Sequence, residues 1–253
     1  MFKLLIATLF LFLTLTSNAQ KHTGISSITG QISFLTAYQK SSPKLPTTDP
    51  PRGRFIWNHR LYYQYQYLIT ERIELNAGLG FNLSYYSLNS GVSLSQMSNL
   101  LVISRPLLPL ESDDTFLKVR FTNFFLAVPL GIRFYLKENT SKHSQPAFSF
   151  QFTPEYLINS GVNARYTIDG KLFPTRSNTS SIDNEIERFY KKTTSSIAYS
   201  LRGGVGVKFK NVDSNMPINH LEFLFVYYFT PYNQDLITNA FGISLGWKWY
   251  FQK

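Results

Sequence analysis

Four histidines are the first side chains to consider for chemistry, because histidine most often serves as a general base in enzymes. His220 and Glu222 are two residues apart, so both would lie on one face of a strand. A serine brought alongside would complete the nucleophile, base and acid of a hydrolase. The simpler interpretation is a structural hydrogen bond between the two. The others are His22 in an expected terminus, His143 in an expected turn and His59 near the end of an expected strand.

Metal ligands are not arranged at any usual spacing. No pair of His, Asp or Glu recurs at the spacing of a zinc site. The chain has no cysteine, which removes thiolate sites, disulfides and the lipid-bearing cysteine of a lipoprotein. Glu111, Asp113 and Asp114 form an acidic cluster that could bind calcium, although such clusters are more often only solvated. We therefore expect no cofactor and no resident metal.

The first twenty residues, MFKLLIATLFLFLTLTSNAQ, have the features of an export signal. Lys3 precedes an apolar stretch, and Ser17 and Ala19 are small residues at the positions that a signal peptidase requires. We expect residues 1–19 to be removed and residues 20–253 to form one domain. A transmembrane anchor is the alternative, but it needs about 20 apolar residues, and this stretch is shorter.

The composition is aromatic and basic, with 16% aromatic residues and a formal net charge of +10. Aromatic residues are spread along the chain and no compact basic patch stands out, so nucleic acid is not an expected partner. A solvated surface accounts for the charge, with some attraction to anionic lipid headgroups or lipopolysaccharide phosphates.

Apolar residues alternate with small or polar residues along most of the chain, which is typical of β-strands. The segment AFGISLGWKWYFQK, residues 240–253, has a large apolar residue at every second position from Phe241 to Phe251. The same alternation predicts eight strands: Ile28–Gln39, Arg54–Ile69, Ile73–Ser87, Phe116–Lys137, Pro146–Val162, Thr194–Lys210, Ile218–Thr230 and Thr238–Phe251.

Long and short connections alternate between these strands for most of the chain, and only the last outer connection departs from the pattern by being short. The long polar segments are 40–53, 88–115 and 163–193, and the short ones are 70–72, 138–145, 211–217 and 231–237. Short periplasmic turns and longer outer loops are typical of outer-membrane barrels. The pattern predicts an all-β fold, an eight-stranded antiparallel up-and-down transmembrane β-barrel. Within the third long segment, SSIDNEIERFYKK at 180–192 fits either a short helix over the barrel mouth or a disordered loop.

The two faces of the strands differ in a way that indicates their surroundings. One face is bulky, and an eight-stranded barrel is only wide enough for its own side chains, so that face must point outwards. It includes Phe121, Phe124, Phe134, Phe148, Phe150, Phe152, Phe223, Phe225, Trp247 and Trp249. The other face carries lone charges, which are costly in a core unless paired. We expect these charges, four positive and three negative, to form a network inside the barrel: Arg60, Glu74, Arg133, Glu155, Arg202, Glu222 and Lys248.

Amphipathic rings near strand ends mark the lipid–water boundary of membrane barrels. The rings near the ends of the expected strands are Trp57, Tyr85, Tyr86, Tyr135, Tyr156, Tyr227, Trp247, Trp249 and Tyr250. Together with Phe251, the three tryptophans are the expected lipid-interface residues. The last strand must pair with the first, because hydrocarbon does not tolerate an unpaired sheet edge. Its aromatic end is of the kind that the outer-membrane assembly machinery engages.

Three segments resemble the Bacteroidetes-type outer-membrane β-barrel family, also described as PorT-like. FFLAVPLGIRFYLK (124–137) resembles one strand of the family, with Pro129 at its proline. FSFQFTPEYLINSG (148–161) resembles the next strand, with Thr153-Pro154 in place of a glycine-proline, and FGISLGWKWYF resembles the final strand. The resemblance implies the fold and an outer-membrane location, and it carries no catalytic motif. Members of the family are linked to gliding and protein secretion.

The expected role is structural or interaction-based at the cell envelope, with neither a diffusion pore nor an enzymatic activity. The outer loops would contact a protein partner, lipid or lipopolysaccharide would surround the barrel, and the assembly machinery would act during biogenesis. Three alternatives stay open: a component of a secretion or envelope complex, a lipid-modifying enzyme using His220 and Glu222, and a soluble ligand-binding barrel. The enzyme is disfavoured because its two residues would lie near the periplasmic end, whereas lipid A enzymes act at the outer leaflet.

Overall fold

The computed structural model describes residues 24–38, 53–90, 115–136, 144–168, 171–173, 191, 194–211, 217–233 and 237–251. The expected signal peptide, His22, His143 and the acidic cluster at 111–114 lie outside these residues. So does the candidate helix at 180–192, apart from Lys191.

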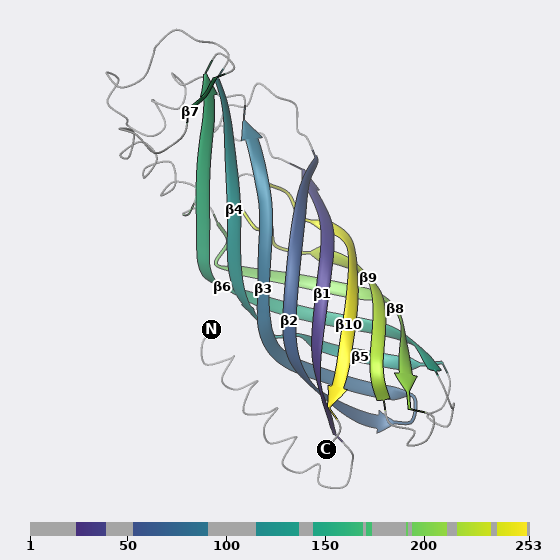
Figure 1. The fold of residues 1–253 in the computed structure, drawn as a ribbon. Helices are drawn as coiled ribbons and strands as arrows, with labels where there is room; N and C mark the ends of the chain where they lie inside the picture. The colour runs from purple at the N-terminus through teal and green to yellow at the C-terminus, as the bar shows by residue number, and fades with distance from the viewer. Residues whose placement is uncertain are drawn as a thin grey trace.

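Antiparallel strands make up the described fold (Figure 1). They are β1 (Ile25–Tyr38), β2 (Gly53–Thr70), β3 (Ile73–Ser90), β4 (Thr115–Ala127), β5 (Leu130–Tyr135), β6 (Ser144–Ile168), β7 (Lys171–Phe173), β8 (Ile197–Lys210), β9 (Pro217–Tyr228) and β10 (Phe241–Phe251). Most are long for a sheet in a soluble protein, where five or six residues is common.

The strands form a closed ring. Each strand of the wall pairs with the next along the chain, and β10 pairs with β1 from Ser26↔Phe251 to Thr36↔Phe241. Because β4 and β5 follow one another between β3 and β6, they form a single interrupted wall strand, and the wall has eight strands. The predicted all-β, eight-stranded antiparallel up-and-down fold is confirmed.

Proline causes the interruption, which corrects the prediction of one continuous strand over Phe116–Lys137. Pro129 separates β4 from β5, and Pro154 lies next to the break on β6. Proline has no N–H to donate to a ladder. The ring stays closed here because the Val128 amide donates to the Pro154 carbonyl at 3.0 Å and the Gly78 amide to the Pro129 carbonyl at 2.9 Å.

The two ends of the barrel differ. We call the end with the Glu71–Arg72 turn, the start of β1 and the end of β10 the turn end, and the opposite end the loop end. At the loop end β3, β4 and β6 continue past their neighbours (Figure 1). Part of the expected loop at 163–193 is therefore strand, because β6 runs to Ile168 and turns back as β7.

Burial alternates along the strands as the sequence pattern predicts. In β10 the large apolar residues are exposed, while Ser244, Gly246, Lys248 and Tyr250 are buried. The inner face of the wall is thus small, polar and charged, and the outer face is apolar. No helix within the described residues has both the length and the apolar composition needed to cross a membrane.

Candidate functional site

The outer face of the barrel is a continuous apolar surface. More than thirty large hydrophobic side chains are exposed on the described strands, with Phe225 at 66% and Phe55 at 63%. The three tryptophans and Phe251 belong to this surface, each 45–48% exposed. The exposed set goes far beyond the few hundred Å² of apolar patch that a soluble monomer shows, so this face requires an apolar environment.

Three rings expected at the lipid–water boundary and one expected on the outer face lie inside. Tyr86, Tyr135 and Tyr250 are at most 8% exposed, and Phe121 is 1% exposed. The two phenylalanines of β4 in the predicted bulky set, Phe121 and Phe124, have opposite parity along the strand, so they cannot share a face. Such rings can lie on the inner face because aromatic side chains pack together at the two ends of the lumen.

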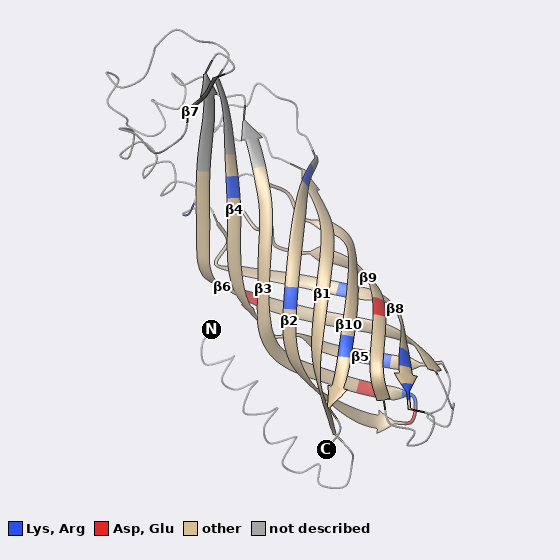
Figure 2. Cartoon of the chain, in the orientation of Figure 1, with Lys and Arg blue, Asp and Glu red and all other residues tan. Residues whose placement is uncertain are grey.

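Charged residues occur within the strands of the wall (Figure 2), and those of the expected network are buried on its inner face. All seven expected residues are at most 7% exposed: Arg60, Glu74, Arg133, Glu155, Arg202, Glu222 and Lys248. Ion pairs divide six of them into two groups. The central cluster is Arg60, Glu155 and Arg202. We define the turn-end cluster as Glu74, Arg133 and Glu222, together with Lys208, which pairs with Glu74, and Lys248, which is the register partner of the neighbouring His220.

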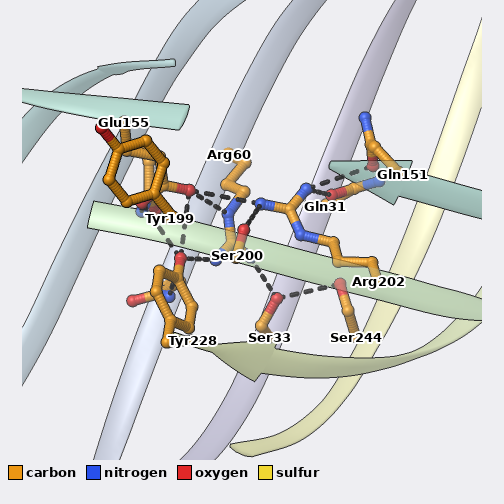
Figure 3. A network of polar contacts seen from close by, with 12 residues as sticks. Gln31, Ser33, Arg60, Gln151, Glu155, Tyr199, Ser200, Arg202, Tyr228 and Ser244 are labelled. Carbon is orange, nitrogen blue, oxygen red and sulfur yellow. Dashed lines mark hydrogen bonds and ion pairs between the residues drawn. The ribbon is translucent and has the colours of Figure 1, made fainter. Parts of the chain in front are cut away.

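Glu155 is the hub of the central cluster (Figure 3). Its Oε1 accepts from Arg202 Nη2 at 3.2 Å and lies 3.4 Å from Arg60 Nε. The Tyr228 hydroxyl lies 3.0 Å from both carboxylate oxygens, and Asn82 Nδ2 donates to Oε2 at 2.7 Å. One carboxylate thus serves two guanidinium groups from strands on different sides of the ring.

The two arginines also donate hydrogen bonds to neutral groups, although Arg202 Nε is buried without a partner among the described residues. Arg202 Nη1 donates to Gln31 Oε1 at 2.8 Å and to the Tyr62 hydroxyl at 3.1 Å, while Arg60 donates to the Ser33 and Tyr228 hydroxyls. Buried charges are tolerated when they are paired and hydrogen-bonded in this way.

Arg133 links the two carboxylates of the turn-end cluster by donating to both Glu74 and Glu222. Glu74 also accepts from Lys208 Nζ at 2.8 Å and from the Tyr135 hydroxyl at 2.6 Å. Lys208 is a cation that the expected network omitted. Lys208 alternates with outward residues of β8 as Arg202 does, so the period-two pattern predicts that it also lies on the inner face.

Aromatic side chains fill the loop end of the lumen. The connection after β9 folds inwards, and Tyr232 is fully buried against Phe125 and Tyr86, with ring centroids 5.6 and 6.1 Å away. Its hydroxyl lies 2.6 Å from the Asn58 side-chain amide. The Ser195 amide donates to the Tyr232 carbonyl at 2.8 Å and holds the connection in place.

The geometry around His220 does not match the order of a hydrolase triad. A serine does lie alongside, because the Ser149 hydroxyl donates to Glu222 Oε1 at 3.2 Å, and His220 Nε2 is also 3.2 Å from that oxygen. The carboxylate therefore lies between the hydroxyl and the imidazole, whereas a triad needs the imidazole in the middle. No group of three or more potential metal ligands occurs among the described residues.

Comparison with known proteins finds no family model and no curated protein that matches the chain. Solved structures do match over most of their length. Neisserial surface protein A (NspA) shares 11% identity over 89% of this chain and 97% of its own, with a TM-score of 0.33. Ail, the attachment invasion locus protein of Yersinia pestis, shares 11% identity over 89% and 99%, with a TM-score of 0.29. The outer membrane enzyme PagL shares 10% identity over 86% and 97%, with a TM-score of 0.32.

Proposed function

We propose that the chain is a small outer-membrane β-barrel with a structural or interaction role at the cell envelope, and that it is not a diffusion pore. The observation that carries this proposal is the inversion of its two faces: the closed ring encloses charged groups and exposes apolar ones. A closed antiparallel barrel leaves no strand edge unpaired, which is what lipid requires of a spanning sheet.

The packed lumen supports the absence of a pore. From the loop end to the turn end it holds the Tyr232 aromatic group, the central cluster around Glu155 and the turn-end cluster around Arg133. Side chains from opposite walls contact one another in each of these layers, so no open path is expected. An eight-stranded barrel is only wide enough for such filling.

The loop end is the proposed contact surface. The strands β3, β4 and β6 extend there past the rest of the wall (Figure 1). They carry the segments 88–115 and 163–193, and 40–53 joins β1 to β2 at the same end. A PorT-like role, as a component of a secretion or envelope complex that binds a protein partner here, is the finer form of the proposal. Surrounding lipid or lipopolysaccharide and the barrel-assembly machinery are the other proposed partners.

Cell fractionation followed by gel mobility tests the proposal. We expect the protein in the outer-membrane fraction and a folded form that migrates differently when the sample is not boiled. Liposomes that contain it should not become permeable to small solutes. Recovery of the protein from the periplasm without detergent would contradict the proposal and favour a soluble ligand-binding barrel.

Crosslinking in cells, followed by purification, tests the interaction role. We expect envelope proteins to be captured through photoreactive residues placed in segment 88–115, and not through one placed on the outward face at Leu245. Equal capture at both positions would argue against a specific contact surface at the loop end.

The enzymatic alternative predicts a lipid A product that depends on Glu222. Because Ser149 donates to Glu222 and not to His220, we expect lipid A from a deletion strain and from cells carrying Glu222→Gln to be identical to wild type by mass spectrometry. If lipid A from both strains lacked an acyl chain or a headgroup modification, the chain would instead be a lipid-modifying enzyme.

A further inference from the structure

The turn-end cluster contains more positive than negative charge. Among its described residues, three cations, Arg133, Lys208 and Lys248, face two carboxylates, Glu74 and Glu222. Arg133 and Lys208 are both within ion-pair distance of those carboxylates. No ion pair or hydrogen bond joins the Lys248 ammonium to any other described residue, although the residue is only 1% exposed.

Lys248 lies in a row of basic residues. In the strand register Lys248 of β10 is the partner of His220 on β9, and His220 is the partner of Lys208 on β8. All three are on the inner face and at most 3% exposed. Directly opposed residues on neighbouring strands have Cβ atoms about 5 Å apart, so these groups can converge on one small ligand.

His220 supplies a second buried group without a partner. Both of its ring nitrogens are buried without a hydrogen-bond partner among the described residues, although Nε2 lies 3.2 Å from Glu222 Oε1. Gly206 makes this ring position possible, because a Cβ at residue 206 would lie 2.5 Å from His220 Nε2. Buried polar groups are normally hydrogen-bonded, so a lysine and a histidine that both lack acceptors indicate a missing acceptor.

We propose that the turn end of the lumen binds a small oxyanion, a phosphate or sulfate, between the Lys248 ammonium and His220, with Lys208 alongside. The anion accepts from Lys248 and from an imidazole N–H, and it offsets the excess positive charge of the cluster. Charge-assisted hydrogen bonds of this kind are about twice as strong as neutral ones.

Calorimetric titration of the refolded barrel with inorganic phosphate tests this site. At matched ionic strength we expect one binding event in wild type and a higher unfolding temperature in phosphate than in chloride. Lys248→Gln should weaken binding by about tenfold or more, as expected for loss of one charge-assisted hydrogen bond. Lys248→Arg, which keeps the charge, should retain it.

The control is Lys191→Gln, which removes a lysine that is exposed to solvent. It should leave phosphate binding unchanged. Absence of any phosphate effect on the wild-type protein would overturn the proposal and would mean that water alone solvates the Lys248 ammonium. Binding that is lost equally in Lys191→Gln would also overturn it, because the anion would then be attracted to the surface.

Discussion

Glu155 is the residue on which the central cluster depends most. Glu155→Gln would keep the volume and leave Arg60 and Arg202 buried without a counter-charge. Removing one partner of a buried ion pair costs about 3–5 kcal/mol, so the free energy of unfolding should fall by that amount. Urea unfolding in lipid vesicles, followed by tryptophan fluorescence, measures it. Glu71→Gln, in the exposed turn, is the control and should change nothing.

Gly206 is expected to be intolerant of any side chain. Its alanine variant would place a Cβ 2.5 Å from His220 Nε2, and overpacking of this kind costs about 1–3 kcal/mol. Adding His220→Ala to Gly206→Ala should recover part of the loss. Gly30→Ala is the matched control, because a Cβ added there, on the outward side of β1, would meet nothing within 4 Å. Equal costs at both glycines would show that the cause is general strand propensity.

The alternation of apolar and polar side chains was the main basis for predicting which face of the wall each residue lies on. A period of two assigns each residue to a face once one face is recognised, and it placed all seven expected charges on the inner side. It could not identify which charges pair. Those partners are up to 134 residues apart, as for Lys208 and Glu74, and depend on the curvature and stagger of the closed wall.

At the level of the elements, the connection between β9 and β10 is the part that the sequence did not predict. A short connection is expected to be a simple loop, yet its described residues include Tyr232, Ile237 and Ala240, which are fully buried. The decisive contacts, with Asn58 of β2 and Phe125 of β4, come from strands distant in sequence. Strand positions were predictable to within a few residues because they follow a local sequence pattern. The packing of this connection depends on distant residues and follows no such pattern.

Tyr232 should control both stability and closure of the lumen. Tyr232→Ala removes a fully buried ring, for which the typical cost is about 3–5 kcal/mol, and it opens the loop end. We expect a matching loss of unfolding free energy and a measurable single-channel conductance in planar bilayers, where wild type has none. Tyr232→Phe keeps the ring and should remain closed. A closed Tyr232→Ala barrel would show that other side chains seal the lumen.

Closure of the ring can be tested with a disulfide, since the chain has no cysteine of its own. Ser33 of β1 and Ser244 of β10 are register partners, and their hydroxyl oxygens are 2.9 Å apart. Cysteines at both positions should satisfy the distance that a disulfide needs. Mass spectrometry after oxidation should show loss of two hydrogens for this pair. Cysteines at Ser33 and Ser149, which are not partners, should stay reduced.

For the whole molecule, the central claim is that the apolar outer face contacts lipid. All three tryptophans of the chain, Trp57, Trp247 and Trp249, lie on that face. Their fluorescence therefore reports on the surroundings of the outer surface without any substitution.

The most direct test is quenching of this fluorescence in liposomes. Phospholipids with brominated acyl chains should quench most of the tryptophan emission of the wild-type protein, while aqueous iodide should have little effect. Strong quenching by iodide with none by the brominated lipid would mean that the aromatic face is in water, and it would contradict the membrane-spanning account.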